Sequence, residues 1–133
     1  MGVRVLKVQR KDMKISITVN ETKLTATIFD SPSARDFLSM LPLNLALENY
    51  ASNERICHLP RKLTTSGSGT FANEAIGDLA YYAPWGNLVF YYGPYRYSNG
   101  LIRLGKLDDD LAPMLADGVS GVRIESFPDL SGR

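Results

Sequence analysis

Residues 77–93, GDLAYYAPWGNLVFYYG, contain the only tryptophan of the chain and four of its seven tyrosines. Two runs with the alternation of β-strands flank the turn residues 84–87. Tyr81 shares a face with Leu79, and the neighbouring Tyr82 takes the opposite face. Because both faces carry apolar or aromatic side chains, this stretch predicts a hairpin of two central strands that are covered on both sides.

Other stretches of the chain show the same period-two alternation and predict strands. They are a hairpin over residues 14–29 and single strands at residues 43–48, 101–107 and about 122–124. In residues 50–76, Pro60 and the glycines of TTSGSGT interrupt any long periodic run. This region therefore predicts at most short strands, together with a mobile loop at residues 64–73.

Two short helices are predicted between the strands. Ser31 supplies a capping oxygen and Pro32 suits the first turn, so a helix is predicted over residues 31–41, which Pro42 ends. The acidic residues Asp108 to Asp110 favour a helix start, which predicts a second short helix over residues 109–116.

Seven or eight short strands with only two short helices predict a mainly β fold. A closed or nearly closed barrel is expected, because closure removes exposed strand edges. A length of 133 residues and an ordinary composition indicate one domain. We place this domain at residues 13–127, after an N-terminal extension or extra strand at residues 1–12 and before a C-terminal tail at residues 128–133.

Charge and composition exclude several classes of function. Fifteen basic and fourteen acidic residues give a net charge of +1, and both signs are interspersed along the chain. No nucleic-acid partner is expected, because such proteins need a clustered basic face. No stretch is apolar enough for a signal peptide or a membrane span, so a cytoplasmic location without a membrane partner is expected. One cysteine and one histidine do not make a zinc site, and neither a metal nor another cofactor is expected.

The order of these elements, together with the stretches GDLAYYAPWGNLVFYY and LGKLDDDL, resembles the cyclophilin-like fold superfamily. The resemblance is to its small, functionally uncharacterised bacterial and archaeal members, and it covers about residues 13–127. LGKL is similar to the Phe-Gly-Lys-Val strand end that precedes the second helix of true cyclophilins. The resemblance implies a closed eight-stranded β-barrel with a short helix over each open end.

True cyclophilins catalyse the cis/trans isomerisation of X-Pro bonds. The reaction needs an apolar slot for the proline ring and an arginine donor aimed at the prolyl nitrogen. Of the family's catalytic motifs, only Phe90 matches, as the second phenylalanine of a Gln-Phe-Phe strand, with Leu88 in the place of the glutamine. The third predicted strand, LNLALEN, has no arginine, and the Phe-Met-x-Gln pattern is not found. A divergent prolyl isomerase is therefore an alternative, with Arg61, Arg96 or Arg103 as the donor.

The leading hypothesis is a barrel that binds a peptide or small molecule in an aromatic groove, without efficient catalysis. A concave aromatic patch with a few polar groups is typical of such sites. The predicted ligand-binding residues are Tyr81, Trp85, Phe90, Tyr92 and Arg96. In the competing interpretation, Tyr81 and Phe90 fill the core and Trp85 covers a turn. A third hypothesis is a homo-oligomeric interaction module, and a monomer or homodimer is expected.

Overall fold

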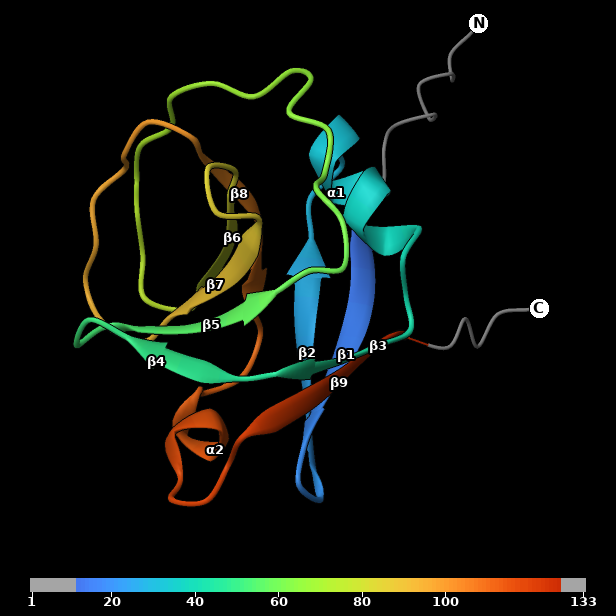
Figure 1. Cartoon of the computed structure of the whole chain (residues 1–133), viewed down its shortest axis with the longest axis vertical. Coiled ribbons are helices and arrows are strands. Elements are labelled where there is room, and N and C mark those ends of the chain that lie inside the picture. The colour runs from blue at the N-terminus through green and yellow to red at the C-terminus, as the bar shows by residue number, and fades with distance from the viewer. Residues whose placement is uncertain (1–11, 128–133) are drawn as a thin grey trace, which may run out of the picture.

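The computed structural model describes residues 12–127 (Figure 1). Except for Asp12, the predicted extension at residues 1–12 and the predicted tail at residues 128–133 lie outside this part. The elements follow in the order β1 (Met13–Val19), β2 (Thr22–Ile28), α1 (Pro32–Leu38), β3 (Leu43–Ala46), β4 (Glu48–Tyr50), β5 (Glu54–His58), β6 (Asp78–Tyr82), β7 (Asn87–Tyr91), β8 (Leu101–Leu107), α2 (Ala112–Leu115) and β9 (Gly121–Ser126).

All strand pairs are antiparallel, and the strands form one sheet in the order β3-β9-β1-β2-β8-β6-β7-β5-β4. The two ends of this order, β3 and β4, are consecutive in the chain and separated only by Leu47. β3 pairs with β9 and β4 pairs with β5, so one stretch of chain joins both edges of the sheet. The result is a nearly closed barrel (Figure 1), and with β3 and β4 counted together it has the eight strands that were predicted.

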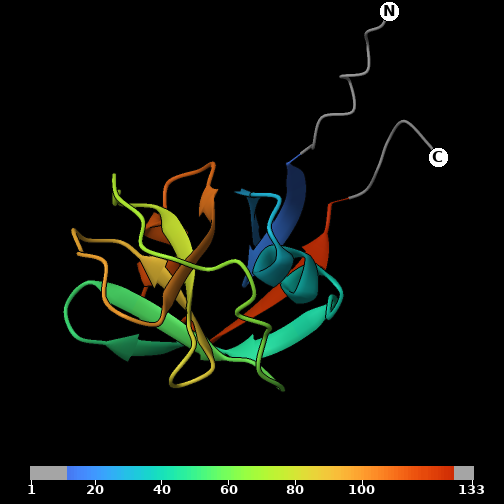
Figure 2. The same cartoon turned by 90° about the horizontal axis from the view of Figure 1, so that it is seen from above.

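The two helices lie at opposite ends of the molecule, α1 beside the upper ends of β1 and β2 and α2 below β4 (Figure 1). Seen from above, α1 lies over the opening of the barrel (Figure 2). Its N-cap is Ser31, whose hydroxyl accepts a hydrogen bond from the Ala34 N–H at 3.2 Å, as predicted. Phe37 points from the helix into the core and is fully buried. No helix in residues 12–127 is long and apolar enough to cross a membrane.

The acidic residues Asp108 to Asp110 before α2 were predicted to favour the start of the helix, but two of them bind β2 instead. Asp108 accepts hydrogen bonds from the hydroxyls of Thr25 and Thr27 at 2.9 and 2.7 Å, and Asp109 accepts one from the Thr25 N–H at 2.9 Å. Only Asp110 bonds the helix start, through the Ala112 N–H at 3.0 Å. The reason is that the chain after β8 continues alongside β2, whose threonines offer nearby donors. The helix therefore begins three residues later than predicted.

Side chains pack on both faces of the sheet around β6 and β7, as their sequence predicted. The inner face contributes to the main core, with Leu79 and Leu88 fully buried there. The outer face carries a second, smaller cluster, which we call the outer cluster. It consists of Ile56, Ala80, Val89, Tyr91 and Leu101, with Phe71, Tyr82, Tyr95 and Tyr97 packed against them.

The first of two long loops, residues 59–77, passes α1 and then runs along the outer side of β6, β7 and β8, where the second loop, residues 92–100, also lies (Figure 1). Arg103 on β8 fastens the first loop, because its guanidinium donates to the carbonyl oxygens of Ala72 and Asn73 at 2.9 and 3.0 Å and lies 4.4 Å from the ring centre of Phe71. The second loop is joined to the first where the Tyr97 N–H donates to Glu74 at 2.8 Å. Both loops therefore cover the outer cluster.

Candidate functional site

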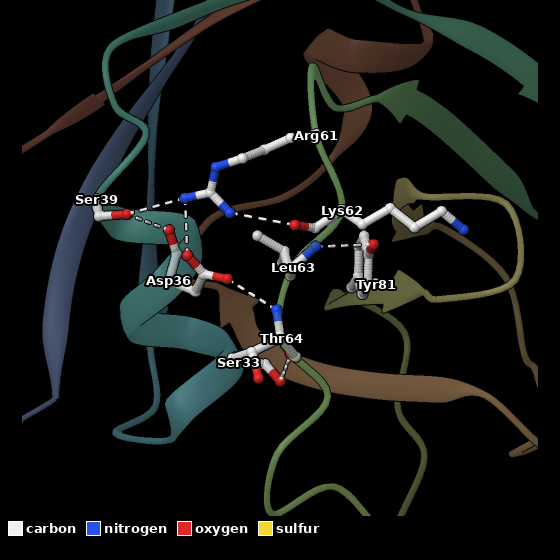
Figure 3. A network of polar contacts seen from close by, with 8 residues as sticks. All are labelled: Ser33, Asp36, Ser39, Arg61, Lys62, Leu63, Thr64 and Tyr81. Atoms are coloured by element: carbon white, nitrogen blue, oxygen red, sulfur yellow. Dashed lines mark hydrogen bonds and ion pairs between the residues drawn. The ribbon is translucent and has the colours of Figure 1, made fainter.

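Two of the five predicted site residues, Tyr81 and Phe90, lie inside the barrel. Both side chains are 0% exposed and belong to the main core. The Tyr81 hydroxyl accepts a hydrogen bond from the Leu63 N–H at 3.0 Å (Figure 3). Neither side chain is accessible to a ligand in this structure, so the placement favours the core interpretation for both.

A network of polar contacts joins α1 to the chain segment above Tyr81 (Figure 3). Asp36 on α1 accepts hydrogen bonds from the Arg61 guanidinium at 2.8 Å and from the Thr64 N–H at 2.7 Å. Both hydrogen bonds lower the pKa of Asp36, and the one from Arg61 has the larger effect. Ser33 on the same helix donates to the Thr64 carbonyl oxygen at 2.6 Å. Arg61 thus acts as a connection between a helix and a loop.

Tyr92 packs against the main core, whereas Arg96 lies apart from it. Tyr92 is half-buried and lines a cavity of about 300 Å³ beside α2, together with Arg55 and residues 115–119. Arg96 is exposed in the second outer loop. The five predicted residues are therefore not gathered in one groove.

Trp85 stands at the centre of a separate aromatic groove. It is 50% exposed, and its ring meets the rings of Tyr50 and Tyr82 edge to face, with centres 5.1 and 5.5 Å apart. The cavity beside these rings has a volume of about 200 Å³. We call it the Trp85 groove, and its wall consists of Tyr50, Glu54, Tyr82, Trp85, Asn87, Val89, Tyr91 and Ser98.

The register of three strands brings these side chains together. Glu54 on β5 is directly opposite Tyr50 on β4 and opposite Tyr91 on β7. Asn87 on β7 is in turn opposite Tyr82 on β6. Since partners in a register point to the same side of a sheet, all of them lie on the outer face.

The turn that carries Trp85 is held from two sides. The Gly86 N–H donates to the Tyr82 carbonyl oxygen at 2.9 Å, and Gly86 has a φ of +74°, a conformation that favours glycine. The Lys62 ammonium donates to the Ala83 carbonyl oxygen at 3.1 Å. Lys62 follows Arg61 in the segment bound to α1 (Figure 3), so the polar network also supports the groove.

Two polar groups of the groove lack partners in the part of the chain that the structure describes. The carboxylate of Glu54 accepts no hydrogen bond and forms no ion pair with residues 12–127, and burial raises its pKa. Asn87 is 1% exposed; its Nδ2 donates to the Leu88 carbonyl oxygen at 3.1 Å, but its Oδ1 is buried without a partner. The groove therefore combines aromatic rings with unsatisfied acceptor oxygens.

Comparison with known proteins identifies the fold family. The model of the cyclophilin-like family matches residues 17–125. The chain belongs to the cyclophilin-like family. The solution structure of a hypothetical protein from Archaeoglobus fulgidus matches this cyclophilin-like barrel with a TM-score of 0.66, covering 87% of this chain and 95% of that chain at 13% identity. No curated protein matches the sequence significantly. A likeness at this identity shows the shared fold alone, so the function has to be argued from the side chains.

None of the three arginines considered for isomerase activity lines the Trp85 groove of this cyclophilin-like barrel. Arg61 is paired with Asp36, and Arg96 lies in an exposed loop. Arg103 lines another cavity, of about 410 Å³, together with Phe29 and Phe71. Within residues 12–127 there is also no group of three or more histidine, cysteine or acidic side chains that could hold a metal ion.

A fourth arginine, Arg55 on β5, was not considered from the sequence of this cyclophilin-like protein. It is 6% exposed and donates to the carbonyl oxygens of Met114 and Val119 at 2.8 and 3.1 Å, which fixes the segment around α2. Arg55 shares the inner face with Cys57, whose burial raises its pKa to about 12.

Several residues of the groove were not predicted from the sequence, namely Tyr50, Glu54, Tyr82, Asn87 and Tyr91. A sequence signal was present for Tyr82 and Tyr91. The alternation in residues 77–93 assigns Tyr82 to the other face of the sheet from Tyr81, and Tyr91 to the other face from Phe90. No comparable signal marked Tyr50 or Glu54, which come from a distant segment.

Proposed function

We propose that this cyclophilin-like protein binds a small molecule, or one side chain of a peptide, in the Trp85 groove and does not catalyse a reaction efficiently. The observation that carries the proposal is the half-exposed Trp85 within a cavity lined by four aromatic rings. Exposed aromatic surface in a concave site is typical of ligand recognition. The cavity, about 200 Å³, is smaller than the roughly 300–1,000 Å³ of drug-sized sites. It therefore suits a single head group or side chain.

The groups around the groove support binding in preference to prolyl isomerisation. Prolyl isomerisation needs a cationic donor beside the apolar slot, but no lysine or arginine lines the Trp85 groove in the part of the chain that the structure describes. Phe90, the one residue that matches the catalytic motifs of true cyclophilins, faces the main core.

A second candidate, the divergent isomerase, is supported by the cavity that joins Arg103 to Phe29 and Phe71. An arginine beside aromatic rings is the combination that the reaction requires. However, the guanidinium already donates to two carbonyl oxygens and to Asp78 at 3.3 Å, so it would have to exchange these partners for substrate. We therefore rank this candidate second. The homo-oligomeric module stays a prediction, which light scattering at several concentrations tests.

The Trp85→Ala variant tests the first proposal. The experiment is a titration of labelled protein, followed by NMR, with a panel of small molecules and X-Pro peptides. We expect shift changes at residues of the groove with the best ligand and a loss of at least about tenfold in affinity in the variant, since loss of a large aromatic contact is worth more than about 1.4 kcal/mol.

The control is Ile76→Ala, because Ile76 is an exposed apolar residue, 59% accessible, that does not line the groove. This variant is expected to bind as the wild type does. Unchanged affinity in Trp85→Ala would remove the groove from consideration. In the same spectra, faster cis/trans exchange of a peptide that is lost in Arg103→Lys would favour the isomerase instead.

A further inference from the structure

The wall of the Trp85 groove carries a negative charge, and no basic side chain of residues 12–127 lines the groove to balance it. Glu54 is the only ionised side chain in its wall. It lies between Tyr50 and Tyr91, its nearest partners in the strand register. Because neither an ion pair nor a hydrogen bond from residues 12–127 engages its half-buried carboxylate, a cationic ligand would find an unpaired anionic partner there.

A second acceptor in the groove also lacks a partner. Asn87 Oδ1 is buried and has no hydrogen-bond donor within the described residues. A buried polar atom without a partner is unfavourable by roughly 1–3 kcal/mol, and such atoms are rare in folded proteins. The groove therefore offers two acceptor oxygens, and positive charge on a ligand would be complementary to both.

The aromatic rings contribute to the same preference. The ring faces of tryptophan and tyrosine carry negative electrostatic potential, and they attract cations that lie within about 6 Å of the ring centre. Tryptophan attracts cations more strongly than tyrosine does. The rings of Tyr50 and Tyr82 meet the Trp85 ring edge to face, at interplanar angles of 86° and 78°. The groove therefore presents aromatic rings in at least two orientations to a ligand.

We propose that the ligand of the Trp85 groove is an organic cation, an alkylated ammonium group held by the rings of Tyr50, Tyr82 and Trp85 and by the carboxylate of Glu54. This inference rests on the proposed function of the groove. An alkylated ammonium carries its charge on an apolar surface, which suits an aromatic wall. Calcium is a poor candidate, because it takes six to eight oxygen ligands. The cation is either a free small molecule or the methylated lysine of a peptide.

The first experiment compares choline with its neutral carbon isostere, 3,3-dimethylbutan-1-ol. Trp85 is the only tryptophan of the chain, so intrinsic fluorescence reports on the groove directly. We expect choline to change this fluorescence and to bind at least about tenfold more tightly than the isostere, since the two differ in charge and hardly in shape. Equal affinities would overturn the inference of a cation and leave the binding function intact.

The second experiment uses Glu54→Gln, with Glu21→Gln as the matched control at the exposed turn between β1 and β2. We expect Glu54→Gln to lose the preference for choline over the isostere, and Glu21→Gln to retain it. NMR spectra of the two variants show whether the fold is kept. A preference that persists in Glu54→Gln would overturn the role of the carboxylate.

A peptide with trimethyllysine, compared with the same peptide with unmodified lysine, distinguishes the sources of the cation. Tighter binding of the methylated peptide than of choline would identify a side chain as the source, and the reverse would identify a free small molecule. If neither cation binds while another compound of the panel changes the Trp85 fluorescence, the cation inference is wrong and the proposed function stands. If no compound perturbs the groove, both are wrong.

Discussion

Glu54 weakens the fold that positions it, and this effect can be measured. Burial raises the pKa of its carboxyl above the ordinary value of 4.5. A carboxyl with a raised pKa contributes stability that is fully present below the ordinary value and is lost as the pH rises through the raised value. At neutral pH, the ionised Glu54 therefore makes the protein without ligand less stable.

We expect Glu54→Gln to increase the free energy of unfolding at pH 7 by about 0.5 kcal/mol, a small value because water partly screens the side chain. At about pH 4 the difference should vanish, since the wild-type carboxyl is then protonated. Urea denaturation of both proteins at the two pH values measures it. A variant that is less stable than the wild type at pH 7 would show that the carboxylate has a stabilising partner.

Two other acidic side chains of the barrel, Asp108 and Asp36, have partners and differ in this from Glu54. Burial works to raise the pKa of Asp108, but hydrogen bonds from Lys14, Thr27 and Thr25 outweigh it, so that the pKa is lowered. Asp36 is likewise bound by Arg61. Carboxyls with a lowered pKa contribute stability above their ordinary value and lose it as the pH falls. Asp108 and Asp36 therefore stabilise the fold at neutral pH, whereas the unpaired Glu54 is expected to do the opposite.

Among the elements, β8 depends on one glycine for its contact with β2. A Cβ atom at Gly105 would lie 2.1 Å from the Thr27 carbonyl oxygen and 2.9 Å from the Ile28 Cα. Both are backbone atoms of the neighbouring strand and cannot move aside without separating the strands. We expect Gly105→Ala to lower the free energy of unfolding by about 3 kcal/mol, as overpacking of a tight contact does.

The matched control for this variant is Gly69→Ala in the first outer loop, where an added Cβ meets nothing within 4 Å. This change should leave the stability within about 0.5 kcal/mol of the wild type. Thermal or urea denaturation compares the two. Equal stability of the two variants would mean that β2 and β8 separate readily, in contradiction to the close contact.

Most elements could be predicted from the sequence, because alternation and turn residues are local signals. The first hairpin, β6, β7 and β8 were found within a residue or two. At most short strands were expected in residues 50–76, and β5 is such a strand. The buried Arg55 places a charge among its inward residues and disturbs the alternation. α1 ends at Leu38, before the predicted end, because the Met40 N–H donates to Phe37 in a tighter turn at 3.0 Å.

The Trp85 groove could be predicted only in part. Trp85 itself was selected, because a tryptophan in a turn tends to be exposed. Tyr50 and Glu54 reach it through the pairing of β4 with β5 and of β5 with β7, and this register is fixed by tertiary packing. For Tyr81 and Phe90, the alternation placed the side chains correctly on one face, but it does not say which face lines the core.

At the scale of the whole molecule, the barrel has two cores of unequal strength. The main core is enclosed by strands and both helices, whereas the outer cluster is covered only by loops. Regions covered by loops open with less free energy than regions enclosed by strands. We expect the amides of residues 71–76 and 92–99 to exchange with solvent at least about tenfold faster than those of β1 and β2.

Hydrogen exchange followed by NMR or mass spectrometry tests this difference between the cores. The Arg103→Ala variant should increase exchange in residues 71–76 further, because it removes the hydrogen bonds to Ala72 and Asn73, and leave β1 unchanged. Equal protection of loops and strands would mean that the molecule opens as a single cooperative unit.

The closure of the barrel through β3 and β4 has a consequence for aggregation. A long unpaired strand edge can template the strand of another chain. In the part of the chain that the structure describes, the free edges are limited to β3 with four residues and β4 with three. Such short edges disfavour a continuous intermolecular sheet. We therefore expect the folded barrel to resist fibril growth through its strand edges.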